Sequence, residues 1–207
     1  WVDGIMLRTF AHQIILDLAA STRIPVINAL TDLLHPCQAL ADFYTLREKK
    51  EGLIGVTFSY VGDGNNVCHS LMFACAKSGT KMAVATPSGY EPNPEIVQQA
   101  LEDGGASGFS LKLTADPAEA VSGADAVYTD VWTSMGQEAE KEKRAKIFAP
   151  YQVNAKLMSY AKFDASFMHC LPAHRGEEVT DEVIDSPNSV VYDQAENRLH
   201  VQKVLML

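Results

Sequence analysis

Short apolar runs alternate along the chain with longer segments in which apolar residues recur every three or four positions. Runs that are apolar on both faces are typical of buried parallel strands, and the longer period is typical of helices that cover a sheet. The predicted strands are residues 5–8, 25–28, 54–61, 82–86, 109–113, 126–129, 166–169 and 190–192. The predicted helices are residues 12–20, 39–50, 67–78, 94–103, 118–121, 137–146, 154–161 and 181–184, with a last one from about 195 to the end. This alternation predicts an α/β fold with a doubly wound, Rossmann-like parallel sheet.

A long helix after Pro36 is the expected boundary between two units, because proline is favoured in the first turn of a helix. Residues 1–35 contain too few elements to bury a core alone, so we expect them to be the end of a first domain. We expect residues 36–52 to form the connecting helix, residues 53–187 a complete second domain, and residues 188–207 a helix that packs back on the first. The abrupt start at Trp1 leads us to expect that further residues precede it in the natural protein.

Composition and charge narrow the classes of partner. Hydrophobic residues make up 47% and charged residues 21% of the 207 positions, which is typical of a globular protein. The chain carries 17 basic and 26 acidic residues, a formal charge of −9, and no stripe of lysine and arginine. We therefore expect neither nucleic acid nor an anionic membrane surface as a partner. Apolar runs also stay well short of the roughly 18 to 20 residues that a membrane span needs.

The four cysteines are Cys37, Cys68, Cys75 and Cys170. None forms a C-x-x-C pair or a Cys/His spacing typical of a metal site, so we expect no metal and a reducing environment. That environment is the cytoplasm, or the matrix of an organelle if the source is eukaryotic.

Polar clusters follow five of the predicted strands at the point where each strand ends. They are Arg8 and residues 35–38, 62–66, 130–136 and 169–172. In an open parallel sheet the carboxyl ends of the strands face one crevice, where ligands bind. The repetition therefore predicts a single site at this edge of the sheet.

The loop GDGNN at 62–66 follows a strand and invites comparison with a dinucleotide-binding turn. Such a turn needs a third glycine for close helix packing and an acidic residue at the end of the next strand. Here the third position is Val67 and the next strand ends in Thr86-Pro87, which disfavours a nucleotide. Backbone amides at a helix start also suit a polar ligand such as an amino-acid carboxylate.

His35 and Gln38 lie three residues apart around Pro36, so their side chains share one face of the first helical turn. An imidazole and a carboxamide at that spacing can donate hydrogen bonds to one carbonyl oxygen. Such donors stabilise the charge that develops on oxygen during nucleophilic attack, by roughly 3 kcal/mol each in good cases. A histidine that caps the helix or packs in the core is the alternative.

Cys170, Asp130 and Arg198 each have two interpretations from their surroundings. Cys170 follows a strand whose alternation places His169 on the other face, so packing is favoured over nucleophilic catalysis. Asp130 can bind an ammonium group or take a proton from an amine, or it forms an ordinary turn. Arg198 offers a cation to an anionic ligand or forms a surface salt bridge.

The charged run 137–144 is interpreted as a solvated helix face without chemistry.

Taken together, the polar loops resemble those of the carbamoyltransferase family, and specifically its ornithine branch. The matching segments are Arg8, HPCQ at 35–38, GDGNN at 62–66, ATPSGYEP at 85–92, DVWTSMG at 130–136, HCLPAHRG at 169–176 and AENR at 195–198. The resemblance implies that carbamoyl phosphate binds first and that the δ-amine of L-ornithine then attacks its carbonyl carbon. It also implies that citrulline and phosphate form without a metal or an organic cofactor.

The resemblance also implies roles for single residues, and it reverses the preference for packing at Cys170. The residues implied to bind carbamoyl phosphate are Arg8, His35, Gln38, Cys170, Leu171 and Arg198. Those implied to contact ornithine are Asn66, Asp130, Ser134 and Met135. The catalytic roles of positioning and charge stabilisation fall to Arg8, His35, Asp130 and Cys170. Residues 1–35 then correspond to the end of the carbamoyl-phosphate domain, and residues 53–187 to the ornithine domain.

One departure from the family pattern is large. The family grips the phosphate with a Ser-x-Arg-Thr-Arg loop, and this sequence contains no such segment; the nearest string, Ser21-Thr22-Arg23, leads into a strand. We therefore expect this chain to have little or no activity alone. The family also implies a homotrimer, or a multiple of trimers, for the full-length protein.

Two alternatives stay open at this point. The acidic residue of DVWTSMG favours ornithine over aspartate, because it attracts a cationic amine and repels a carboxylate. Putrescine or N-acylated ornithine is the alternative acceptor. A non-catalytic amino-acid-binding module that kept the fold is the alternative from a different class.

Overall fold

The computed structural model describes residues 1–134 and 136–207, with the backbone but not the side chain of Glu138. The described strands are β1 (Ile5–Arg8), β2 (Val26–Leu30), β3 (Thr57–Val61), β4 (Lys81–Ala85), β5 (Leu111–Thr114), β6 (Ala126–Thr129) and β7 (Ser166–His169). They form a two-stranded sheet, β1-β2, and a five-stranded sheet in the order β5-β4-β3-β6-β7. All the paired strands run parallel. The predicted α/β fold with a Rossmann-like parallel sheet is confirmed.

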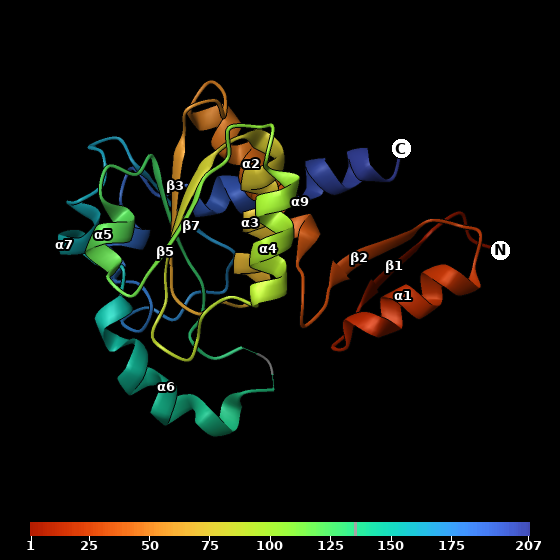
Figure 1. Cartoon of the computed structure of the whole chain (residues 1–207), viewed down its shortest axis with the longest axis horizontal. Helices are drawn as coiled ribbons and strands as arrows, with labels where there is room; N and C mark the ends of the chain where they lie inside the picture. The colour runs from red at the N-terminus through yellow and green to blue at the C-terminus, as the bar shows by residue number, and fades with distance from the viewer. Residues whose placement is uncertain (135) are drawn as a thin grey trace.

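Helices connect the strands and cover the sheets (Figure 1). They are α1 (His12–Ser21), α2 (Pro36–Lys49), α3 (Asn66–Ser78), α4 (Pro94–Asp103), α5 (Pro117–Val121), α6 (Lys141–Phe148), α7 (Ala155–Met158), α8 (Asp181–Ile184) and α9 (Val191–Leu205). Two 3₁₀ turns, η1 (Glu138–Glu140) and η2 (Ala149–Tyr151), flank α6. Among the described residues, no helix has the length and apolar character needed to cross a membrane.

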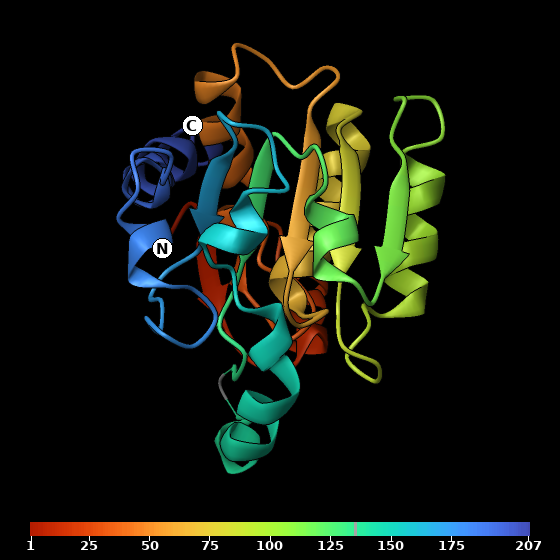
Figure 2. The same cartoon turned by 90° about the vertical axis from the view of Figure 1, so that its left-hand side faces the viewer.

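The five-stranded sheet is covered on both faces. Figure 1 views it nearly edge-on, with α5 and α7 on one side and α3 and α4 on the other, and Figure 2 views it face-on. Successive residues of a strand point to opposite faces, and β4 illustrates this alternation. Met82 and Val84 pack in the apolar layer that includes α2 and α3, whereas Ala83 and Ala85 pack in the layer that includes α5, α7 and α8. Strands of this kind bury both faces, which explains why their sequences are continuous apolar runs.

The predicted strand at 190–192 is wrong. Val190 is the N-cap of α9, which begins at Val191. The chain does approach the sheet here, because Ser189 forms an isolated parallel bridge with Phe167 and the Val190 amide donates to the Phe167 carbonyl at 3.0 Å. A single bridge at the β7 edge does not make a strand. The β-branched residues Val190 and Val191 suggested a strand, but Val191 is buried on the inner face of α9 instead.

Several predicted helix ends also differ from the structure. The segment 137–146 divides into η1 and α6, and the helix predicted at 154–161 ends at Met158. The last helix begins at Val191 rather than near 195. Helix ends are set by capping contacts that the apolar pattern does not encode.

The order of the strands determines where a ligand can bind. From β3 the chain continues through β4 to β5 on one side, and then returns to β6 and β7 on the other. The crevice at such a switch point is the usual ligand site of an open α/β sheet, at the carboxyl ends of the strands. Here the switch lies between β3 and β6. The loops that follow β3, β6 and β7 therefore converge.

Candidate active site

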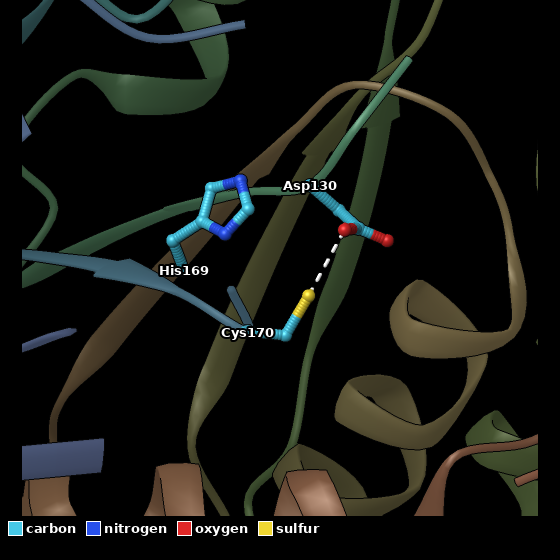
Figure 3. A group of neighbouring side chains, drawn as sticks. All are labelled: Asp130, His169 and Cys170. Atoms are coloured by element: carbon cyan, nitrogen blue, oxygen red, sulfur yellow. Dashed lines mark hydrogen bonds between the residues drawn. The ribbon is translucent and has the colours of Figure 1, made fainter. Parts of the chain in front are cut away.

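Asp130 lies at the centre of this convergence, directly after β6. Its Oδ2 accepts a hydrogen bond from Asn65 Nδ2 at 2.7 Å. Its Oδ1 accepts from Cys170 Sγ at 2.9 Å and from the Val131 amide at 2.8 Å. Figure 3 shows the thiol of Cys170 directed at the carboxylate. Side chains from the loops after β3, β6 and β7 thus meet on one carboxylate, as the repetition of polar clusters predicted.

The loop after β3 is shaped by its own hydrogen bonds. Asn65 caps α3, because its Oδ1 accepts from the amides of Val67 and Cys68. Its Nδ2 is then directed at Asp130. Gly64 is required here, since a Cβ at this position would lie 2.3 Å from the backbone nitrogen of Pro92. The glycines therefore allow a close approach between two loops, which agrees with the interpretation of GDGNN as a tight turn.

The chemical state of Cys170 follows from its surroundings. Burial raises the pKa of the thiol well above its ordinary value, and the charge and hydrogen bond of Asp130 raise it further. At neutral pH the thiol therefore stays protonated and donates a hydrogen bond to the carboxylate. Cys170 orients Asp130 in this state rather than acting as a thiolate nucleophile.

His169 supports the same loop from the strand end. It is fully buried, its Nδ1 accepts from the Leu171 amide at 2.8 Å, and its Nε2 lies 3.1 Å from Glu178 Oε1. Leu171 has a φ of 54°, in the left-handed region that L residues rarely adopt. Such a conformation costs roughly 1–3 kcal/mol and persists where neighbouring contacts hold it. The supporting role of His169 was not predicted from the sequence, because it depends on the contact with Glu178, nine residues away.

A second polar cluster joins α2 to α9. Gln38 Oε1 accepts from the Arg198 guanidinium at 2.6 Å, and Gln38 Nε2 donates to Asp42 Oδ1 at 2.8 Å. The amide nitrogen that we assigned to a substrate carbonyl is therefore already used by Asp42. The oxygen of Gln38 is directed towards Arg198.

His35 lies beside this cluster at the N-cap of α2. Its pKa is lowered from 6.5 to about 4, first by burial and then by the positive charges of Arg198 and Arg8; a backbone hydrogen bond with Ala29 acts in the opposite direction. The imidazole is therefore neutral at pH 7. Its backbone amide donates to Ser70 Oγ at 2.7 Å. The structure thus brings Arg8, His35, Gln38 and Arg198 into one electrostatic environment.

A buried bridge connects the two clusters. Gln194 of α9 donates from Nε2 to Asp42 Oδ1 at 2.8 Å, and its Oε1 accepts from the His169 amide at 3.1 Å. The polar chain therefore runs from Arg198 through Gln38, Asp42 and Gln194 to the strand end that carries Cys170. Sequence analysis named neither Asp42 nor Gln194.

The remaining predicted site residues lie at the margins. Asn66 donates from Nδ2 to the Thr31 carbonyl at 2.6 Å, whereas the neighbouring Asn65 is the amide that donates to Asp130. Ser134 is half-buried and its amide donates to Gln137 Oε1 at 3.0 Å. Leu171 is also half-buried. Met135 lies outside the described residues.

Arg144 corrects the interpretation of the charged run 137–144. Its side chain is only 3% exposed. It donates from Nε to the Trp132 carbonyl and from NH2 to Asp63, and its guanidinium lies 4.7 Å from the centre of the Tyr90 ring. Arg144 therefore ties the loop after β6 to the loop after β3. Its spacing of four from the buried Phe148, which places both on the inner face of α6, was the available signal.

Asp130, His169 and Cys170 also have the donor types of a metal site. One ligand atom from each lies within 4.8 Å of the others. In the structure, however, both ring nitrogens of His169 and the thiol of Cys170 are engaged in hydrogen bonds. A metal at this position has to displace those contacts, so the cluster fits hydrogen bonding better than coordination.

Comparison with known proteins identifies this arrangement. Residues 54–207 match the Asp/Orn binding domain of aspartate/ornithine carbamoyltransferases. Residues 1–48 match the carbamoyl-P binding domain of the same enzymes.

Individual relatives agree with the domain matches. The chain is 61% identical over 206 residues to ornithine carbamoyltransferase of Thermococcus kodakarensis and 59% identical to that of Bacillus subtilis. It is covered completely in both cases and spans about 65% of each relative's length. The solved structure of ornithine carbamoyltransferase from Pyrococcus furiosus superposes with a TM-score of 0.96 at 59% identity, over 100% of this chain and 66% of that one. The chain therefore belongs to the aspartate/ornithine carbamoyltransferase family.

Proposed function

We propose that the protein transfers the carbamoyl group of carbamoyl phosphate to the δ-amine of L-ornithine, giving L-citrulline and phosphate. The observation that carries this proposal is the buried Asp130 carboxylate at the switch point of the sheet, held by Asn65 and Cys170. An anionic group in that crevice suits a cationic amine. Relatives that cover the whole chain are named ornithine carbamoyltransferases, which supports the same acceptor.

The reaction needs positioning and charge stabilisation more than covalent catalysis. The neutral δ-nitrogen attacks the carbonyl carbon, a C–N bond forms, and the bond from carbon to the phosphate oxygen breaks. One proton leaves the nitrogen during this exchange. Asp130 orients the amine and offers the nearest acceptor for that proton, while the protonated Cys170 thiol holds the carboxylate in place.

The carbamoyl side is assigned to the cluster on α2 and α9. Arg8 and Arg198 supply positive charge for the carbonyl oxygen and the phosphate, and the neutral His35 imidazole can donate one hydrogen bond. Gln38 presents an oxygen, which suits the carbamoyl NH₂ group better than its carbonyl. The backbone at Cys170 and Leu171 lies between the two substrates in this proposal.

The acceptor side is assigned to Asn66, Asp130, Ser134 and Met135. The Nδ2 of Asn66 donates to the Thr31 carbonyl, so in this assignment its Oδ1 is the atom that accepts from ornithine. The name of the relative from Pyrococcus furiosus includes the word anabolic, which supports a place in arginine synthesis.

The wider organisation is proposed on the same footing. Residues 1–35 belong to the carbamoyl-phosphate domain, 36–52 connect the domains, 53–187 form the ornithine domain, and 188–207 pack back on the first. The full-length protein is a homotrimer or a multiple of trimers and needs no metal or organic cofactor for the transfer. It works in the cytoplasm or an organellar matrix, where the four free cysteines are stable.

Citrulline formation tests the proposal in a protein that carries the whole family length. The amines compared are ornithine, putrescine, N-acetylornithine and aspartate. Ornithine should be preferred, and Asp130→Asn should lower kcat/KM for it by about a hundredfold or more, whereas the exposed Asp116→Asn serves as the matched control. A preference for putrescine refutes L-ornithine as the acceptor. Ornithine binding by calorimetry without any turnover points to a binding module instead.

The 207-residue chain should show little or no turnover by itself, because it contains no Ser-x-Arg-Thr-Arg phosphate loop. Adding the missing part of the carbamoyl-phosphate domain should restore citrulline formation. Rapid turnover by the 207-residue chain contradicts this expectation.

A further inference from the structure

A second group of potential metal ligands lies in the turn that follows the Cys170 loop. His174, Glu177 and Glu178 each offer one ligand atom, and these atoms lie within 4.8 Å of one another. We propose that this turn binds a divalent transition cation such as Zn²⁺. The inference goes beyond the proposed carbamoyl transfer and does not depend on it.

The backbone of the turn is fixed before any ligand binds. The Glu177 amide donates to the His174 carbonyl at 2.9 Å, and the Gly176 amide donates to the Val179 carbonyl at 2.8 Å. Gln152 Nε2 donates to the carbonyls of Gly176 and Glu177 at 3.0 and 2.8 Å. A site on a fixed backbone loses little conformational entropy when it binds an ion.

Glu178 is the residue that most needs a further partner. Its side chain is completely buried, and its Oε1 accepts from His169 Nε2 at 3.1 Å and from the His174 amide at 2.6 Å. Its Oε2 is also buried, with no hydrogen-bond partner in the described part of the chain. A buried acceptor without a partner is destabilising, because it has lost its hydration without gaining a hydrogen bond. A cation bound to Oε2 removes that cost.

The distance between Glu178 and His174 fits an ion between them. His174 Nδ1 lies 3.9 Å from Glu178 Oε2, which is too far for a hydrogen bond. Zinc bonds to imidazole nitrogen and carboxylate oxygen are each about 2.0–2.2 Å long, so two such bonds span this gap. The His174 side chain is 48% exposed and can rotate slightly to reach a tetrahedral angle.

Glu177 provides the third ligand. One of its oxygens lies 3.5 Å from Lys141 Nζ, and both side chains of this ion pair are partly exposed. Exposed ion pairs contribute little to stability, so a doubly charged cation can replace Lys141 as the partner of Glu177. One imidazole and two carboxylates favour zinc over the hard cations Mg²⁺ and Ca²⁺, which prefer sites made of oxygen alone. Water completes the coordination on the open side.

Occupancy of this site affects the neighbouring active-site loop. Glu178 holds His169, and His169 in turn accepts the hydrogen bond of the Leu171 amide. A cation bound to Glu178 therefore restrains the backbone that follows Cys170. Zinc should slow hydrogen exchange at the Leu171 amide.

Calorimetric titration of Zn²⁺ into the 207-residue chain tests the proposal. Asp130, His169 and Cys170 have the donor types of a competing zinc site, so the measurement is made in a Cys170→Ser background that removes the thiol. One site should remain there, and adding His174→Ala should weaken its affinity by more than about tenfold, the lower end of the loss seen even for residues that only support metal ligands. His200→Ala, another exposed histidine paired with a carboxylate, is the matched control. Mg²⁺ should give no binding heat.

Co²⁺ spectra separate the two clusters in the unmodified chain. Binding at His174, Glu177 and Glu178 should give weak visible bands without a thiolate charge-transfer band. His174→Ala is at an exposed position, so circular dichroism should show an intact fold. Unchanged zinc affinity in His174→Ala, or loss of all zinc binding in Cys170→Ser, overturns the proposal.

Discussion

Asp130 and Cys170 are 40 positions apart in the sequence, yet they share a hydrogen bond of 2.9 Å. Taken alone, Cys170 favoured packing and Asp130 was compatible with an ordinary turn. Their contact couples the two groups, because burial and then the charge of Asp130 raise the pKa of the thiol, and the protonated thiol orients the carboxylate. At the scale of single residues, chemistry depends on which neighbour the fold supplies.

The raised pKa of Cys170 leads to a prediction for Asp130→Asn. Removing the carboxylate charge should lower the Cys170 pKa, although burial, the largest cause of the shift, remains. The alkylation rate of Cys170 by iodoacetamide, followed by mass spectrometry across pH, should then reach half its maximum at a lower pH. Asp116→Asn removes an exposed carboxylate and should leave the profile unchanged. An unchanged midpoint in Asp130→Asn contradicts this account of the thiol.

Helix α6 illustrates how a whole element can combine two roles. Most of its charged residues are exposed, as the run of charges predicted. Arg144 instead points inward and binds the Trp132 carbonyl and Asp63, so α6 fastens together the loops after β6 and β3. A charged side chain on the buried face of a helix is stable only when it is paired with an opposite charge or hydrogen-bonded to buried polar groups.

Substitution of Arg144 should destabilise the protein strongly. In Arg144→Gln, Asp63 loses its buried cation, and breaking one side of a buried ion pair costs about 3–5 kcal/mol. Urea unfolding should show this loss, whereas the exposed neighbour Lys143→Gln should change the free energy of unfolding little.

The double variant Asp63→Asn with Arg144→Gln provides the control for that explanation. It leaves no buried carboxylate without a partner, so it should recover part of the lost stability. If the double variant is no more stable than Arg144→Gln alone, the loss arises from packing against Tyr90 and Phe148 instead.

Across the whole molecule, Asp42 is the point where α2, α9 and the end of β7 are joined. It is fully buried and accepts hydrogen bonds from Gln38 and Gln194. Asn197 strengthens the same contact between helices by donating to Thr45 and Glu48, each at 2.9 Å. The C-terminal helix is thereby tied to the helix that leads from the small sheet to the large one (Figure 1).

Asp42 should make the stability of the protein depend on pH. Burial raises its pKa from 3.8 to about 6. The folded state therefore binds this proton more tightly than the unfolded state, and the resulting stability is complete below pH 3.8 and lost as pH rises through 6. Asp42→Asn lacks this pH-dependent gain. When the pH is lowered from 7 to 5, the free energy of unfolding of the unmodified protein should therefore rise relative to that of the variant by on the order of 1 kcal/mol.

Urea unfolding at the two pH values measures this shift. The other buried carboxylates are the same in both proteins and cancel in the comparison. Glu196→Gln, which removes an exposed acid from α9, should follow the unmodified protein. A constant difference between Asp42→Asn and the unmodified protein contradicts the role assigned to this carboxyl.

Much of the fold was predictable because local patterns specify it. The bounds of β1, β6, β7 and α4 agree with the prediction, since short apolar runs and a proline at a helix start are strong local signals. Residues 190–192 failed because β-branched residues also suit the buried face of a helix. The candidate site divides in the same way: its loops were predicted, but its hydrogen bonds were not.

The two adjacent asparagines show why hydrogen bonds escape sequence analysis. The family resemblance assigned ornithine contact to Asn66, whereas in the structure Asn65 binds Asp130 and Asn66 binds the Thr31 carbonyl. One residue caps α3 and the next begins it, so their side chains leave the backbone in different directions. The sequence alone does not show which of two neighbouring amide side chains reaches a given partner.

By itself, the sequence determined the alternation of strands and helices, the parallel sheet and the set of polar loops at its carboxyl edge. These follow from periodicity and turn chemistry, which act over a few residues. Only the tertiary structure decided that Cys170 donates a hydrogen bond to Asp130, that Arg144 is buried, and that Asp42 links the Gln38–Arg198 cluster to the strand end beside Cys170. Those outcomes depend on burial and on partners distant in sequence, which exist only once the chain has packed.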